Sequence, residues 1–472
     1  MLQSENDPKS IPLIALAVVL TLAAGFVIAK FSYVVAGAIV LGIIIAVVSF
    51  ISGELALYLL LFSMLLSPQF MVGGVGGESV RGRGITLRLD DFLLVIMGLG
   101  WFLKTSVRKD LGLFLKTPLN GPIFYYFLAC AVSTLFGFMM GRVKGGAGFF
   151  FVIKYFEYFI VYFMAVNYLK SREQIERFTN IMLIVCFIVC IVAISQIPSG
   201  VRVSAPFEGP EGEPNTLGGY LVLMLSVLLG LRLAGYGKWM AKTFFWILLL
   251  FILVALAATL SRASWLAMVP MFIVLFAFSK RKLLISGCIL AILIAAPFIV
   301  PETVKDRVLY TFKQRPESGQ MMVGGVRIDT STSERLQSWK IVLTNDFKRH
   351  PVIGFGVTGY RFLDAQYARV LAETGLVGLI AFLFLIGSIF RVSVRAYREA
   401  SDPLYSGLTL GFLGGFAGLL THALGANTFI IVRIMEPFWF LTAMIVMIPA
   451  LEKRERKEEH EGLKARAVSG QH

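Results

Sequence analysis

Runs of about twenty apolar residues recur from one end of this 472-residue chain to the other. That length is what an α-helix needs to cross the hydrocarbon core of a membrane. Hydrophobic residues make up 57% of the chain and charged residues 15%, whereas a soluble protein usually carries about 25% charged residues. Lipid cannot hydrogen-bond an exposed backbone, so the runs must be helical. The sequence therefore predicts an all-α fold, a polytopic transmembrane helical bundle of about 12–14 spans.

The polar N-terminus lacks the basic region of a secretory signal, so the first apolar run is expected to remain as a span. Two runs are weaker than the others: 264–278 is short, and 86–103 opens with Arg88, Asp90 and Asp91. The expected spans are residues 11–29, 32–51, 55–71, 86–103, 121–141, 149–169, 178–197, 216–231, 243–260, 264–278, 283–301, 372–390, 404–421 and 430–450.

Lysine and arginine are distributed unequally between alternate loops. One set, which includes both termini, holds 23 basic residues, and the short loops of the other set hold nine. Cytoplasmic loops carry the excess of Lys and Arg, so both termini are predicted to be cytoplasmic, in a bacterial inner membrane. The chain then divides into an N-terminal bundle (1–301), a large outward-facing loop (302–371), C-terminal helices (372–450) and a charged cytoplasmic tail (451–472), expected to fray.

The large loop is the main extramembrane segment, and it is expected to contain short helices. Ser333–Asp346 carries apolar residues at Leu336, Trp339 and Leu343, a helical stripe behind a serine cap. A glycine-rich turn at 354–359 follows, and the chain then leads into the next span at Gly375.

Several function classes find no support in the sequence. The net charge of +15 is explained by cytoplasmic loops near anionic lipid rather than by nucleic acid. All four cysteines lie in apolar runs, and the four histidines lack metal-ligand spacing. With no nucleotide-binding loop and no D-x-D motif, we expect neither a metal nor a cofactor. Chemistry is expected on the outer face, with substrates that arrive through the membrane.

The outer face collects polar residues that suit an anionic substrate. Arg262 interrupts an apolar stretch, where a charge is costly and usually has a partner or a role; alternatively, it marks a tight turn and extends to the headgroups. Arg202 and Asn215 bracket a Pro/Gly-rich loop, which could also be an ordinary turn. Lys154 and Glu157, spaced i, i+3 in an expected span, could form an internal ion pair.

Guanidinium groups form several hydrogen bonds to phosphate oxygens and can neutralise the charge of a pyrophosphate leaving group in place of a metal. An acceptor hydroxyl would need a base, and Asp364 and Glu208 are the acidic candidates. Arg361/Asp364 and Arg369/Glu373 could instead be simple helix salt bridges. The catalytic candidates are Asp364, Arg262 and Arg361, and the substrate-binding candidates are Arg202, Asn215, Arg327, Arg335, Trp265, Trp339 and Lys154.

Four stretches resemble the bacterial O-antigen ligase and O-antigen polymerase superfamily of membrane glycosyltransferases. They are T-L-S-R-A-S-W-L (259–266), G-P-E-G-E-P-N-T-L-G-G-Y-L (209–221), S-E-R-L-Q-S-W (333–339), which H-P-V-I-G-F-G (350–356) follows, and D-A-Q-Y-A-R-V-L-A-E-T-G-L-V-G-L (364–379). The resemblance covers roughly residues 150–390.

The resemblance implies that a glycan on undecaprenyl pyrophosphate is transferred on the outer leaflet to an acceptor sugar hydroxyl. It also implies that arginines at Arg262 and in the outer loop hold the pyrophosphate. Many ligases carry a histidine where this chain has Asp364, and polymerases more often carry an acidic residue there, which favours polymerase over ligase. The expected enzyme is an inverting, metal-independent transferase whose partners are the lipid-linked oligosaccharide, an acceptor glycan and the bilayer, with a chain-length regulator as a further candidate.

Two readings of other classes stay open. A lipid-linked oligosaccharide flippase would place charged groups near the bilayer midplane, and only Lys154 and Glu157 fit that pattern. A non-catalytic assembly subunit would tolerate loss of the arginines.

Overall fold

The computed structural model describes residues 51–74, 84–107, 115–208, 212–237, 239–283, 285–287, 302–314, 320–323 and 325–469, together with 45, 47 and 48. Over these residues the chain is helical apart from two short antiparallel hairpins, β1–β2 and β3–β4. The expectation of an all-α polytopic protein is confirmed.

The elements of the first half of the chain are α3 (Gly53–Leu66), β1 (Gln69–Gly74), β2 (Gly84–Arg88), α4 (Leu89–Val107), α5 (Asn120–Met139), α6 (Gly145–Tyr168), α7 (Arg172–Ser195), η1 (Ile197–Ser199) and α8 (Pro214–Ala234). Those that follow are α9 (Trp239–Ala258), α10 (Arg262–Phe278), α12 (Glu302–Lys313), β3 (Met322–Val323), β4 (Val326–Arg327), α13 (Thr330–Ile341), η2 (Val342–Asp346), η3 (Phe347–Arg349), α14 (Gln366–Glu399), α15 (Pro403–His422), η4 (Thr428–Ile430) and α16 (Val432–Ser469).

Seven helices in the described part of the chain are long and apolar enough to cross a membrane: α5, α6, α7, α8, α14, α15 and α16. Three shorter apolar helices, α3, α9 and α10, also coincide with expected spans. The expected span at 86–103 corresponds to α4. The expected spans 11–29, 32–51 and 283–301 lie wholly or largely outside the described residues. The chain is a multi-pass membrane protein.

The chain divides into two compact units. The smaller comprises residues Met1–Leu60 and Asp90–Leu113, which include most of α3 and α4. The larger comprises Leu61–Leu89 and Phe114–His472, and every candidate site residue belongs to it.

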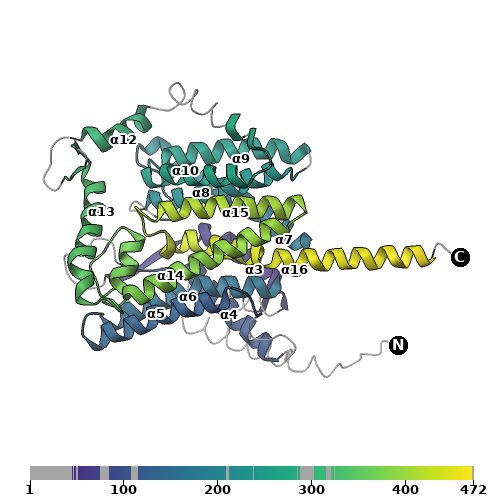
Figure 1. The fold of residues 1–472 in the computed structure, drawn as a ribbon, viewed down its shortest axis with the longest axis horizontal. Helices are drawn as coiled ribbons and strands as arrows, with labels where there is room; N and C mark the ends of the chain where they lie inside the picture. Colours follow the sequence, from purple (N-terminus) through teal and green to yellow (C-terminus); the bar gives the residue numbers. More distant parts are fainter. Residues whose placement is uncertain are drawn as a thin grey trace, which may run out of the picture. The chain divides into compact units, whose positions relative to one another are not determined.

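Glycines bring α8 and α15 into close contact in the centre of the larger unit, where the two helices lie side by side (Figure 1). A Cβ atom added at Gly230 of α8 would lie 2.3 Å from the backbone nitrogen of Gly411 on α15. Gly407 and Gly411 of α15 would meet the α8 backbone at 2.7 and 2.5 Å in the same way. Small residues of this kind let membrane helices approach without side chains between them. This contact places the start of α8 and the end of α15 together.

The segment between α10 and α14 contains short helices, as expected, and α13 runs crosswise to the bundle helices at one end of them (Figure 1). The start of α13 differs from the prediction. Its N-cap is Asp329 rather than Ser333, because the Asp329 carboxylate accepts hydrogen bonds from the backbone amides of Ser331 and Thr332. A carboxylate is a strong N-cap, and the helix therefore begins one turn earlier.

A backbone break at Gly375 divides α14 into two helical segments. Its φ of 65° is left-handed, and a Cβ there would lie 2.4 Å from the carbonyl oxygen of Val352. Gly354 of the glycine-rich turn packs against the same break, since its Cβ would lie 2.6 Å from the Glu373 carbonyl carbon. Glycine is required on both sides of this contact. The turn at 350–356 thus fixes the segment Gln366–Thr374, and with it the chain around Asp364.

The charged C-terminal tail continues α16 as far as Ser469 rather than fraying. Pairs spaced i, i+4, such as Arg454–Glu458 at 2.7 Å, lie along it. Such pairs add a few tenths of a kcal/mol each to an exposed helix.

Candidate functional site

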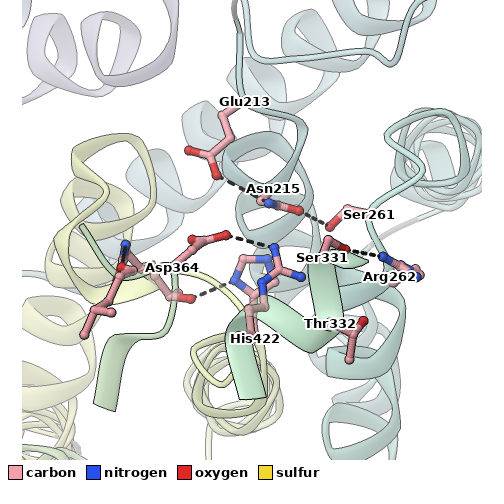
Figure 2. Close-up of polar contacts among 12 residues, drawn as sticks. Glu213, Asn215, Ser261, Arg262, Ser331, Thr332, Asp364 and His422 are labelled. Carbon is pink, nitrogen blue, oxygen red and sulfur yellow. Dashed lines mark hydrogen bonds and ion pairs between the residues drawn. The ribbon is translucent and has the colours of Figure 1, made fainter. Parts of the chain in front are cut away.

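The candidate site lies where helix ends from distant parts of the sequence meet: the starts of α8, α10, α13 and α14 and the end of α15 (Figure 2). Ser261 caps α10 by accepting a hydrogen bond from the amide of Ser264. Its hydroxyl also donates to Asn215 Oδ1 on α8 at 2.7 Å. Leu260, directly before this cap, has a left-handed φ of 49°, a conformation that costs a non-glycine residue energy. The turn that presents Arg262 is therefore held by specific contacts.

Arg262 forms a two-pronged ion pair with the N-cap of α13. Its Nη1 and Nη2 atoms donate to the two carboxylate oxygens of Asp329 at 2.8 and 2.9 Å, and Nη2 also donates to Ser331 Oγ at 2.7 Å. Burial raises the pKa of Asp329, but the hydrogen bonds from Arg262, Ser331 and Thr332 outweigh it and hold this pKa well below its usual range. The sequence predicted a partner or a role for Arg262, and Asp329 is its partner.

Asp364 pairs with Arg335 and not with Arg361. Arg335 Nη2 lies 2.8 Å from Asp364 Oδ2, and Figure 2 shows the Asp364 carboxylate facing this contact. The guanidinium of Arg361 lies over the ring of Tyr360, 5.6 Å from its centroid, and the residue is exposed. The helix pair expected for Arg361 and Asp364 is wrong because both residues precede α14, which starts at Gln366. The expected pair Arg369–Glu373 is present, at 3.2 Å.

Two further arginines adjoin these ion pairs. Arg202 donates to the carbonyl oxygens of Thr259 and Leu260 at 2.9 and 3.3 Å, and the Arg307 guanidinium lies over Tyr310 at 5.7 Å. Burial lowers the pKa of Arg202 to about 10, with added repulsion from Arg307, Arg262 and Arg335. Burial, then repulsion from Arg262, also lowers the pKa of Arg307.

We call Arg202, Arg262, Arg307 and Arg335 the arginine cluster. Two members are paired with aspartates, whereas Arg202 hydrogen-bonds backbone carbonyls and Arg307 lies over a ring. Arg202 also interacts electrostatically with Glu213, and Arg307 with Asp329. Four guanidinium groups thus face the three carboxyl groups of Asp329, Asp364 and Glu213, which leaves an excess of positive charge.

Two glutamates of the loop before α8 lie beside the cluster. Glu213 Oε1 accepts from Asn215 Nδ2 at 3.3 Å, and Glu208 Oε2 accepts from the Glu213 amide at 3.0 Å. Burial raises the pKa of Glu208 to about 7 although Arg433 lies 3.6 Å away. Burial, and then repulsion from Asp364, also raises the pKa of Glu213. A carboxyl group with the pKa of Glu208 can accept and return a proton near neutral pH.

His422 reaches the site from the end of α15 (Figure 2). Its Nδ1 atom lies 2.7 Å from Thr428 Oγ1, and its buried Nε2 atom has no hydrogen-bond partner among the described residues. His422 was assigned no role from the sequence, because it lies far along the chain from the four stretches that carry the resemblance.

The remaining candidates lie elsewhere. Trp265 donates to the Leu256 carbonyl at 3.3 Å, and Trp339 packs on a small core around Leu363. Arg327 is exposed on β4. Lys154 lies within α6 and forms the expected ion pair with Glu157, at 3.1 Å.

Four members of the site were missed by the sequence analysis: Arg307, Asp329, Glu213 and His422. Asp329 carried a usable signal, since the run D-T-S-T-S-E-R has the pattern of an N-cap before a helix. Glu213 lies in the stretch 209–221 that carries the resemblance, but nothing in the local pattern distinguished it from the other glutamate there. Arg307 and His422 carried no signal, because their role depends on contacts between remote segments. Within the described residues, no group of three or more His, Cys, Asp or Glu side chains is arranged to hold a metal ion.

Residues 246–383 match the family model described as O-antigen ligase. This segment is similar to O-antigen ligases. The resemblance seen in the sequence is confirmed over this segment, and no curated protein matches the chain. The matched segment contains Arg262, Asp329, Arg335 and Asp364, whereas Arg202, Glu213 and His422 come from outside it. This family indicates a glycosyl-transfer enzyme, a membrane glycosyltransferase of the O-antigen ligase or polymerase type that acts on a lipid-linked glycan.

Proposed function

We propose that this protein transfers oligosaccharide units from undecaprenyl pyrophosphate to a sugar hydroxyl of an acceptor glycan, as an O-antigen or exopolysaccharide polymerase. The observation that carries the proposal is the arginine cluster with its excess positive charge. A lipid pyrophosphate that leaves the anomeric carbon develops negative charge, and preorganised guanidinium groups stabilise that charge without moving. The site would face the periplasm, with both termini in the cytoplasm and the chain in the inner membrane.

Each cluster member has a proposed part. Arg262 and Arg335 are held in place by Asp329 and Asp364, so they present fixed charge to the pyrophosphate. Arg202 and Arg307 supply charge beyond that balanced by the two aspartates, which already pair with Arg262 and Arg335. Asp364 then positions Arg335, and a ligand phosphate competes for the same guanidinium. The reaction is proposed to invert the anomeric centre and to need no metal, because the arginines replace the cation.

The direct test uses purified full-length protein in lipid nanodiscs and a lipid-linked repeat unit extracted from the host. A polymerase yields a ladder of longer glycans on undecaprenyl pyrophosphate. A ligase, the alternative, yields a product only when lipid A-core is added. Absence of transfer with either acceptor would refute the proposal and leave a flippase or an assembly subunit.

A binding test isolates the arginine cluster from turnover. Undecaprenyl pyrophosphate should inhibit transfer more strongly than undecaprenyl monophosphate. Arg307→Ala should weaken this inhibition and lower the rate by about 10²-fold, the usual cost of losing one donor to a developing charge. Arg349→Ala, which removes an exposed arginine of η3 in the same segment, is the matched control and should change neither. If undecaprenyl pyrophosphate inhibits both variants equally, Arg307 does not belong to the binding site for the pyrophosphate.

A further inference from the structure

A cavity of ≈ 220 Å³, lined in part by Glu213, adjoins the arginine cluster. Its walls come from the first half of α6, the starts of α8 and α16, the end of β2 and the loop before α8. They include the rings of Phe150, Phe151 and Tyr155 and the charged groups of Lys154, Glu208 and Glu213. From Gly145 to Lys154 the helix α6 rises about 14 Å (nine residues at ~1.5 Å each), so the cavity extends well below the helix ends.

The charges around the cavity occur in opposed pairs. Arg433 lies 3.6 Å from Glu208, and Lys154 lies 3.1 Å from Glu157. Arg88 lies 3.5 Å from Glu436. Unlike the arginine cluster, these walls therefore carry no excess of positive charge, and the cavity does not suit a pyrophosphate.

The cavity also differs from a site for a lipid chain. A hydrocarbon chain is best placed among apolar side chains, because unbonded polar groups beside it cost free energy. Here aromatic rings and the aliphatic segment 430–432 line the same space as several charged groups. Rings supply flat apolar faces and charged groups supply strong hydrogen bonds. A neutral ligand with many hydroxyl groups and flat CH faces, a sugar ring, satisfies both kinds of wall.

The volume limits how much of a glycan can enter. Clefts for drug-sized ligands have roughly 300–1,000 Å³, and this cavity is smaller. It accommodates one sugar ring, so the rest of an acceptor glycan would remain outside.

Glu213 connects the cavity with the arginine cluster. Its side chain lines the cavity, and its carboxylate bonds Asn215, which in turn bonds Ser261 directly before Arg262 (Figure 2). Glu213 also interacts electrostatically with Asp364, Arg335 and Arg202. It therefore stands between the space for a sugar and the groups proposed to hold the leaving pyrophosphate.

We propose, on the basis of the proposed function, that this cavity binds the terminal sugar of the acceptor glycan and that Glu213 is the base that activates its hydroxyl. The acceptor oxygen forms a bond to the anomeric carbon of the donor as the bond from that carbon to the pyrophosphate oxygen breaks. The hydroxyl proton passes to the Glu213 carboxylate. The electron pair leaves with the lipid pyrophosphate, whose charge the arginine cluster neutralises. The raised pKa of Glu213 suits this role, because a base works best when its pKa is close to the working pH.

The acceptor probe is the free repeat-unit oligosaccharide, released from its lipid by mild acid. It lacks pyrophosphate and so can act only as an acceptor. With the extracted lipid-linked unit as donor, Glu213→Gln should lower kcat by at least about 10²-fold while the donor KM stays within about twofold. The fall in wild-type rate toward acid pH should also disappear in this variant. Glu213→Asp should recover part of the rate, which a purely structural role would not require.

Paired substitutions on one helix test the cavity itself. Phe151→Leu should raise the acceptor KM by up to about tenfold, because it removes a ring that lines the cavity. Phe156→Leu is the matched control: Phe156 lies on the same helix, packs on Phe127 at 4.9 Å and does not line the cavity. Glu208→Gln should raise the acceptor KM more than it lowers kcat.

The outcomes separate the two proposals. No transfer by the wild-type protein refutes the proposed function. If the wild type is active and the kcat of Glu213→Gln lies within threefold of the wild-type kcat, the base assignment is overturned. Equal acceptor KM values for Phe151→Leu and Phe156→Leu, or a rise in donor KM alone for Phe151→Leu, overturn the acceptor site.

Discussion

The ion pair between Arg262 and Asp329 gives the most informative prediction, because it separates an anchoring role of Arg262 from a catalytic one. Arg262→Ala removes three charge-assisted hydrogen bonds, two to Asp329 and one to Ser331. The Asp329 side chain is 1% exposed, so its charge would lose its partner with little access to water. Removal of one partner of a buried pair costs about 3–5 kcal/mol. Arg262 itself is 20% exposed, and water can replace part of its contribution, so we expect about 3 kcal/mol.

The expected effect is local, since Asp329 caps α13. A loss of about 3 kcal/mol corresponds to roughly 10²-fold more frequent opening of that helix. Hydrogen exchange of the α13 amides, followed by mass spectrometry, measures this opening directly. Exchange in α8 and α15, which pack on each other through glycines, should be unchanged and serves as the internal control.

The double variant Arg262→Ala/Asp329→Asn decides between the two roles. It removes the buried charge together with its partner, and asparagine still caps α13, so the α13 amides should regain most of their protection from exchange. If Arg262 holds the pyrophosphate, transfer should stay about 10²–10³-fold below wild type in the double variant. Arg262→Lys should restore only part of the rate, since an ammonium group cannot bridge two oxygens. Full recovery of transfer in the double variant would refute the catalytic role and leave Arg262 as an anchor of the outer loop.

Three further predictions follow from single contacts. Lys348 is exposed in the segment between α10 and α14, so a cysteine at this position should react with an impermeant maleimide in cells with a permeabilised outer membrane. The variant Lys457→Cys, on the C-terminal tail, should not react. The opposite pattern would reverse the proposed orientation. Asp364→Asn and Arg335→Ala should have overlapping rather than additive effects on transfer because the two groups pair at 2.8 Å, and strict additivity in a double-mutant cycle would mean that Asp364 acts independently of Arg335. The folded state raises the pKa of Glu208 to about 7, so it binds a proton more tightly than the unfolded chain does. The contribution of Glu208 to stability should then be largest below about pH 4.5 and fall as the pH rises toward 7. Between pH 5 and 8 the thermal unfolding temperature should fall in the wild type and fall less in Glu208→Gln. Equal dependence of the unfolding temperature on pH in the two proteins would contradict this prediction.

The membrane architecture follows from the sequence because its cause is local. A run of about twenty apolar residues must form a helix in lipid whatever its neighbours are, so the expected spans that lie within the described residues correspond to helices. Local motifs also singled out Arg262, Arg335 and Asp364 as candidates. The helical stripe around Trp339 predicted α13, although the cap of this helix lies earlier, at Asp329.

The pairing of these residues depends on tertiary structure. Spacing along a helix suggested Arg361 as the partner of Asp364, but α14 starts only at Gln366. The partner of Asp364 is instead Arg335, which lies on α13. Glu213 and His422 reach the site because glycines let α8 and α15 approach closely, a contact that no local pattern encodes. Ion pairs and cavities depend on a few ångströms between segments that are hundreds of residues apart, such as Glu208 and Arg433. The sequence by itself therefore determined which chemical groups lie near the ends of the expected spans, and only the packing of the helices decided which of them meet.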